Sequence, residues 1–175
     1  MRKGLIIAAA VVQAAIVAGM LYMAMEPLRT GRLLVVEVQG VDPRDIMRGQ
    51  YVELSYPFST VSLDSVTCDL DRYGVYRYGD VVYVSLDGTV DPKVRTISLN
   101  KPEDDGPYLK GRIPRRFSGS PLTTLDVEYG IESYFTNPDR ADDLDSILIR
   151  SGRVRVHLRV DDDGDARIAD LEVIE

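Results

Sequence analysis

Cysteine and histidine are nearly absent from this sequence, and acidic residues outnumber basic ones. The single cysteine, Cys68, cannot form an internal disulfide, and one histidine, His157, leaves no Cys/His cluster for zinc, haem or an iron–sulfur centre. The 21 basic and 28 acidic side chains give a net charge of −7, which does not supply the phosphate neutralisation that nucleic-acid binding requires. We predict no metal, cofactor or nucleic-acid partner. The 175 residues, 45% of them hydrophobic, are typical of one folded domain with an appendage.

The appendage is a long apolar run near the N-terminus. Residues 5–25 read LIIAAAVVQAAIVAGMLYMAM, with no charge and with Gln13 as the one strongly polar side chain. About 20 helical residues cross the ~30 Å hydrocarbon core of a bilayer, so this run predicts a membrane-spanning helix. A cleaved secretory signal is the alternative, but its apolar region is normally about 7–15 residues long. Because Met23–Glu26 offers no small-x-small cleavage site, we expect a retained anchor in the lipid bilayer.

The charges beside this run predict its orientation. Arg2 and Lys3 precede it, and positive charge beside a first span tends to stay in the cytoplasm, although Arg29 and Arg32 on the other side oppose this assignment. We expect a single-pass protein of the cytoplasmic (inner) membrane, with its N-terminus inside and residues 30–175 extracytoplasmic. The expected units are an anchor at 1–26, a juxtamembrane linker at 27–32 in which Pro27 ends the helix, and a β-rich domain at 33–175.

Beyond the linker the hydrophobic pattern becomes a series of short β-branched and aromatic runs, several of which alternate apolar with polar residues. Eight strands are predicted, at 33–39, 51–56, 81–86, 94–99, 109–113, 125–129, 153–160 and 166–173. Two short helices are predicted at Asp42–Gly49 and Asn137–Ser151, each with a capping residue followed by proline. The fold class is therefore mainly β, a compact β-barrel or β-sandwich after the transmembrane helix. The pattern does not distinguish barrel from sandwich.

The segment at residues 41–56, VDPRDIMRGQYVELSY, is the most informative part of the chain, and YGIESYFTNP follows it at 129–138. These residues resemble the GDYXXLXY family of bacterial membrane-anchored proteins. Gly49, Tyr51, Leu54 and Tyr56 match the signature at its spacing, whereas Gln50 replaces its acidic residue. The resemblance covers the whole chain. It implies a membrane-tethered extracytoplasmic domain, often encoded beside a polytopic membrane protein, and it implies no activity.

Two interpretations of this signature remain open. A strand after Gly49 would place Leu54 and Tyr56 on one face and Tyr51 on the other. In the first interpretation, Leu54 and a tyrosine fill the core. In the second, a binding site for a ligand or partner consists of two arginines, an aspartate and two tyrosines, since guanidinium groups recognise carboxylate or phosphate by two-point contacts. Its residues are Arg44, Asp45, Arg48, Tyr51 and Tyr56.

Two further clusters could form a surface. Six of the ten tyrosines lie between Tyr51 and Tyr83, which suits a partner surface or a sugar-binding face as well as it suits strand packing. The basic residues Lys110, Arg112, Arg115 and Arg116 form a dense patch. They are either alternate strand positions in water or a docking patch for an acidic partner or lipid headgroup.

Catalysis and calcium binding are the weaker possibilities. The sequence GDVVYVSL after Tyr78 is similar to a segment of signal-peptidase-like serine proteases, but none of Lys93, Lys101 and Lys110 lies in a recognisable catalytic segment. Residues 161–172 have the acidic spacing of a calcium loop, but Ala166 stands where that loop requires glycine, so we expect a hairpin that turns at Asp163-Gly164. We predict a non-catalytic interaction or accessory module for a membrane partner, and a polytopic membrane protein is one candidate for that partner. A ligand-binding sensor and a signal-peptidase-like hydrolase are the alternatives.

Overall fold

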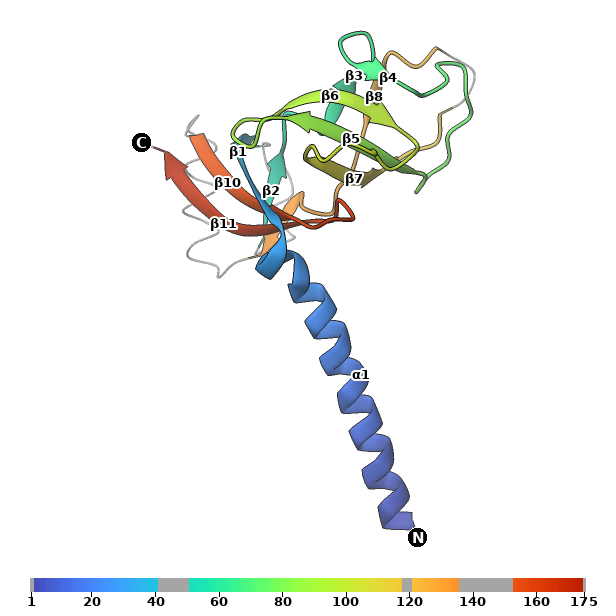
Figure 1. The fold of residues 1–175 in the computed structure, drawn as a ribbon, viewed down its shortest axis with the longest axis vertical. Coiled ribbons are helices and arrows are strands. Elements are labelled where there is room, and N and C mark those ends of the chain that lie inside the picture. The colour runs from blue at the N-terminus through green and yellow to red at the C-terminus, as the bar shows by residue number, and fades with distance from the viewer. Residues whose placement is uncertain (1, 41–50, 118–120, 136–152, 175) are drawn as a thin grey trace.

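The computed structural model describes residues 2–40, 51–117, 121–135 and 153–174, which form one long helix and a strand-rich domain (Figure 1). The helix α1 (Arg2–Thr30) leads into β1 (Arg32–Gly40). The remaining strands are β2 (Tyr51–Ser55), β3 (Thr60–Ser62), β4 (Thr67–Cys68), β5 (Val81–Asp87), β6 (Lys93–Ser98), β7 (Tyr108–Arg112), β8 (Thr124–Asp126), β9 (Ser133–Phe135), β10 (Arg153–Val160) and β11 (Ala166–Ile174). The two predicted short helices fall outside the described residues.

Helix α1 projects away from the domain and is long and apolar enough to span a membrane (Figure 1). An 18-residue window within Ile6–Thr30 has a mean hydropathy of 2.2, and the apolar side chains of α1 are exposed, as expected for a surface that lipid covers. The helix does not end at Pro27, as the sequence predicted, but continues to Thr30. The predicted linker at 27–32 is thus divided between α1 and β1, with Gly31 alone between them.

The strands form three sheets. A five-stranded sheet has the order β11-β10-β1-β2-β9, a four-stranded sheet has the order β4-β6-β5-β7, and β3 pairs with β8. Every pair of these strands is antiparallel except β4 with β6. Each of the eight predicted strands is present. Pattern reasoning missed the short strands β3, β4 and β9, which have two or three residues each and so offer too little alternation to detect.

One hydrophobic core joins these sheets, and in the described residues neither large sheet closes into a barrel. Strand β10 shows how the pattern produces the core. Its sequence RVRVHLRV buries Val154, Val156, Leu158 and Val160 and turns the alternate basic side chains away from the core. The cluster also takes in Leu34 from β1, together with residues from β2, β5, β6, β7, β8 and β11. The mainly β class is confirmed, in the form of open sheets that share a core.

The turn between β5 and β6 links the two large sheets by docking on β1. The backbone N–H of Val35 donates to the carbonyl oxygen of Thr89 over 2.8 Å, and that of Asp91 donates to the carbonyl oxygen of Val35 over 2.8 Å. The side chain of Asp91 accepts a further bond from the backbone N–H of Glu37 over 2.9 Å. Asp91 holds a positive φ of 46°, a conformation that aspartate tolerates better than most residues. This turn fixes one sheet against the other.

Candidate functional site

The described part of the signature segment lies in and just after β2 and faces the core. Leu54 and Tyr56 are buried, whereas Glu53 and Ser55 are exposed, as the predicted alternation requires. The hydroxyl of Tyr56 donates to the carbonyl oxygen of Ile131 over 2.9 Å. Burial raises the pKa of the Tyr56 phenol far above its ordinary value, with a smaller contribution from Glu132. Tyr56 is therefore a neutral core residue with a satisfied hydroxyl.

The second part of the family pattern, at 129–135, packs against this strand. The ring of Tyr56 stacks on Phe58 at 5.2 Å between centroids, and Tyr129 meets Phe58 edge-on at 5.3 Å. The buried hydroxyl of Tyr129 donates to the carbonyl oxygen of Phe58 over 2.8 Å. Sequence reasoning did not identify Phe58, because a single aromatic residue outside the family pattern does not indicate which residues it contacts in the fold.

Glu132 completes this junction from the turn before β9. Its carboxylate accepts the backbone N–H of Tyr129 at 2.6 Å and that of Gly130 at 2.9 Å, while its carbonyl oxygen accepts from Leu54 N–H at 2.8 Å. Gly130 has a φ of 77°, which a glycine adopts without strain. The two segments thus have a structural reason to occur together, since each satisfies buried polar groups of the other.

The binding residues predicted from the sequence are only partly placed. Arg44, Asp45 and Arg48 lie outside the described residues, together with Gly49 and Gln50 of the signature. Tyr51 begins β2 and pairs with Phe135 in the register of β9, but its side chain is not described. The site formed by these residues and Tyr56 stays a prediction.

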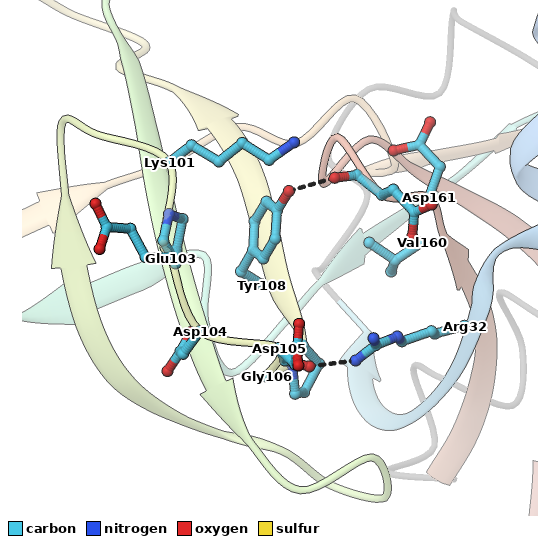
Figure 2. A pocket seen from close by; sticks show the side chains of 12 residues that line it. Arg32, Lys101, Glu103, Asp104, Asp105, Gly106, Tyr108, Val160 and Asp161 are labelled. Atoms are coloured by element: carbon cyan, nitrogen blue, oxygen red, sulfur yellow. Dashed lines mark hydrogen bonds between the residues drawn. The ribbon is translucent and has the colours of Figure 1, made fainter.

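A pocket of about 260 Å³ lies where α1 enters the domain (Figure 2). Arg32, the second residue after the helix, lines it and donates to the carbonyl oxygen of Asp105. Tyr108 stands across from it and donates through its hydroxyl to the carbonyl oxygen of Asp162. Both bonds are drawn in Figure 2 and hold the loop before β7 against the start of β1 and the β10–β11 turn. Sequence reasoning missed this pocket because its walls come from three distant segments.

Two ion pairs beside the pocket join the β10–β11 turn to Lys101 and to strand β7. Lys101 Nζ lies 3.0 Å from Asp163 Oδ1, and Lys110 Nζ lies 3.1 Å from Asp165 Oδ2. The hydrogen bond to Asp163 raises the pKa of Lys101, and the same bond lowers the pKa of Asp163. Each group is thereby held in its charged form at neutral pH.

The β10–β11 hairpin confirms the turn predicted at Asp163-Gly164. Oδ1 of Asp161 accepts the backbone N–H groups of Asp163 and Asp165, both at 2.9 Å. Gly164 has a φ of 82° and lies so close to Tyr108 that an added Cβ would stand 2.6 Å from its ring. The acidic spacing that suggested a calcium loop here builds a tight turn packed on β7.

Residues 72–80 form a loop that exposes aromatic and apolar side chains, and we call it the tyrosine loop. Tyr73 and Tyr78 are 76% and 77% exposed, and Val75 is 59% exposed. Tyr76, between them, is instead buried, and its hydroxyl donates to the carbonyl oxygen of Asp71 over 2.9 Å. Of the six clustered tyrosines, Tyr56 and Tyr76 thus serve the core, whereas these two meet solvent.

Backbone bonds hold the tyrosine loop at both ends. Tyr76 and Phe117 exchange two backbone hydrogen bonds, at 3.2 and 3.0 Å. The N–H of Gly79 donates to the carbonyl oxygen of Ile113 over 2.9 Å, and Ile113 N–H donates to the carbonyl oxygen of Asp80 over 2.9 Å. The loop is therefore fixed along the segment that follows β7, away from the point where α1 joins the domain (Figure 1).

The predicted basic patch is largely paired inside the domain. Lys110 contacts Asp165, Arg115 contacts Asp126, and Arg112 donates to the carbonyl oxygen of Gly79 over 3.3 Å. Arg116 is exposed and has no ion-pair partner in the described part of the chain.

A family model for the GDYXXLXY protein matches residues 13–171, nearly the whole chain. The chain belongs to the GDYXXLXY family. No curated protein and no solved structure matches it. In this GDYXXLXY protein the match extends from within the apolar helix to β11, so the helix and the β-domain both belong to the family pattern. The signature positions Leu54 and Tyr56 belong to the core of that unit.

Proposed function

We propose that this GDYXXLXY protein is a non-catalytic interaction or accessory module for a membrane partner, anchored in the cytoplasmic membrane by residues 5–25 with residues 30–175 extracytoplasmic. The tyrosine loop is the observation that carries the proposal. Exposed tyrosine is enriched at protein interfaces because its ring buries a large area while its hydroxyl stays hydrogen-bonded. The bonds around Tyr76 hold Tyr73 and Tyr78 in place before binding, which lowers the entropy lost on association.

The junction with the membrane supports the same function. Because Gly31 alone separates α1 from β1, the domain is not free to move on a long tether. Arg159 reinforces the junction by donating to the carbonyl oxygen of Gly31 over 2.9 Å. A partner in the same membrane therefore meets the loop at a defined height.

The hydrolase alternative is disfavoured by the lysines. A serine–lysine dyad needs a lysine whose pKa is lowered by desolvation, so that the amine can accept a proton. The pKa of Lys101 is instead raised by Asp163, and Lys110 pairs with Asp165. The pocket beside Arg32 is the observation that favours the sensor alternative. The ion pair between Lys101 and Asp163 at this pocket also holds the β10–β11 turn in place, which is a structural role.

Site-specific photo-crosslinking tests the proposal. The full chain carries a photoreactive phenylalanine analogue in place of Tyr73 or Tyr78, in native membranes, with the exposed Lys93 position as the matched control. We expect one discrete adduct with a membrane protein from the loop positions and none from Lys93. A double variant, Tyr73→Ser with Tyr78→Ser, should keep its melting temperature and lose co-purification of that protein. Equal crosslinking from Lys93, or no partner while the protein hydrolyses an ester, peptide or glycan, contradicts the proposal.

A further inference from the structure

Within the described residues, two arginines form no ion pair, one in the tyrosine loop and one in the segment bonded to it. Arg77 follows Tyr76 in the loop, and Arg116 precedes Phe117 in the segment bonded to it. Because Tyr76 and Phe117 form an antiparallel bridge and turn toward the core, Arg77 and Arg116 are neighbours on the outer side, and both are exposed.

Neither guanidinium group forms an ion pair with a carboxylate in the described part of the chain. Asp80, the nearest acidic residue along the loop, uses its side chain to accept the backbone N–H of Arg77 over 2.7 Å. Asp126 pairs with Arg115, and Asp64 pairs with Arg72 at 2.6 Å. Like charges that face each other across antiparallel strands repel, so the pair is destabilising unless an anion joins it.

The surroundings define which anion fits. Tyr73, Val75 and Tyr78 are the large exposed apolar and aromatic side chains of this loop, and they flank Arg77 in sequence. Tyrosine and arginine together are the residue types that dominate binding energy at protein interfaces. In a chain whose net charge is −7, these two arginines form a local positive region, and charge complementarity at close range favours an acidic group there.

We propose that the tyrosine loop binds an acidic segment of its protein partner, with Arg77 and Arg116 holding one or two carboxylates and with Tyr73 and Tyr78 packing against the neighbouring side chains. A carboxylate accepts two parallel hydrogen bonds from one guanidinium group, and acidic side chains supply it in a protein partner. This inference rests on the proposed function, because it names the chemistry of the partner at the same loop.

Fluorescence anisotropy with a labelled hexaglutamate peptide tests the inference directly, on the full chain in detergent micelles. We expect saturable binding that weakens at least tenfold between about 50 and 500 mM salt, since exposed charges are screened over about one Debye length. Arg77→Gln with Arg116→Gln should lower the affinity at least tenfold. Lys93→Gln, which removes an exposed positive charge elsewhere, should leave the affinity unchanged. Circular dichroism melting checks that every variant remains folded.

The outcomes separate this inference from the proposed function. If the Tyr73 crosslink forms and survives the double Gln substitution, the loop binds its partner without these arginines, and the acidic-segment inference fails alone. If no crosslink forms to any membrane protein, the proposed function fails. Tighter binding of polygalacturonate than of hexaglutamate, or weakening by Lys93→Gln equal to that of the double variant, also overturns the inference.

Discussion

At the scale of single residues, tyrosine serves opposite purposes in this protein. Tyr56 and Tyr129 are buried and donate to the carbonyl oxygens of Ile131 and Phe58, whereas Tyr73 and Tyr78 are exposed. Burial disfavours the phenolate, so the pKa of both buried phenols is raised above its ordinary value of 10.0. Composition counts these residues alike, but their environments give them different chemistry.

Replacing Tyr56 should change both stability and its dependence on pH. Tyr56→Phe leaves the Ile131 carbonyl without its partner and should cost about 1–2 kcal/mol at neutral pH. Above pH 10 the unfolded chain releases a proton that the folded chain retains, so the free energy of unfolding falls as pH rises. The slope approaches about −1.4 kcal/mol per pH unit for each such phenol.

Denaturant unfolding at pH 7 to 11 in detergent measures both effects. The decline above pH 10 should be shallower in Tyr56→Phe than in the parent chain. Tyr73→Phe removes an exposed hydroxyl and serves as the control, with both quantities unchanged. An identical slope in Tyr56→Phe and the parent chain would show that Tyr56 ionises in the folded state as it does in the unfolded state.

At the scale of elements, the β5–β6 turn determines how the two large sheets meet. Strand β1 pairs with β10 along one edge and with β2 only at Gln39 and Gly40, so the turn occupies part of its other edge. The turn does so through the backbone of Thr89 and Asp91 and through the Asp91 carboxylate. The residues of the turn connect β5 to β6, and the bonds from the turn to β1 join the four-stranded sheet to the five-stranded sheet.

Asp91 should therefore be sensitive to substitution in a graded way. Asp91→Ala loses the bond to Glu37 N–H, and alanine tolerates a positive φ less well than aspartate does. Together these effects should cost about 1–3 kcal/mol. Asp91→Asn keeps an acceptor oxygen and tolerates this φ, so it should cost less than about 1 kcal/mol. Guanidinium unfolding of the full-length variants in detergent gives both values. Equal losses would mean that neither the bond nor the backbone conformation contributes.

At the scale of the whole molecule, the proposed anchoring by α1 predicts the height of the domain above the membrane. The apolar run ends at Met25, and residues 26–30 continue α1 for about 7.5 Å at ~1.5 Å per residue. That distance is close to the thickness of one headgroup layer, taken as half of the difference between the ~30 Å core and the ~40–45 Å bilayer. If α1 spans the bilayer as proposed, strand β1 begins at the outer limit of the headgroups, and the tyrosine loop lies farther from the membrane.

Cysteine labelling on spheroplasts tests the orientation and the retained anchor. In a Cys68→Ser background, Lys93→Cys should react with a membrane-impermeant maleimide, whereas Gly4→Cys should react only after lysis. The intact mass of the membrane-bound protein should include residues 5–25. Reaction of Gly4→Cys on sealed spheroplasts would reverse the orientation, and a loss of about the first 25 residues would show a cleaved signal.

The sequence by itself determined the apolar helix, the eight main strands and the shared face of Leu54 and Tyr56. Each of these depends on periodicity within a few neighbouring residues, which the backbone converts directly into a helix or into two faces of a strand. The family signature was readable for the same reason, because its residues are close together in the chain. The helix end at Thr30 could not be predicted in this way. Proline inside a helix normally breaks or kinks it, whereas α1 continues for three residues beyond Pro27.

Only the tertiary structure decided which charges and aromatic rings remain free. The sequence shows Lys110, Arg115 and Arg116 as one basic patch, but folding brings Asp165 and Asp126 to the first two and leaves Arg116 beside Arg77. The pocket at Arg32 and the docked turn at Asp91 likewise join segments more than 50 residues apart. Such contacts depend on how whole sheets pack around a shared core, which no local pattern encodes.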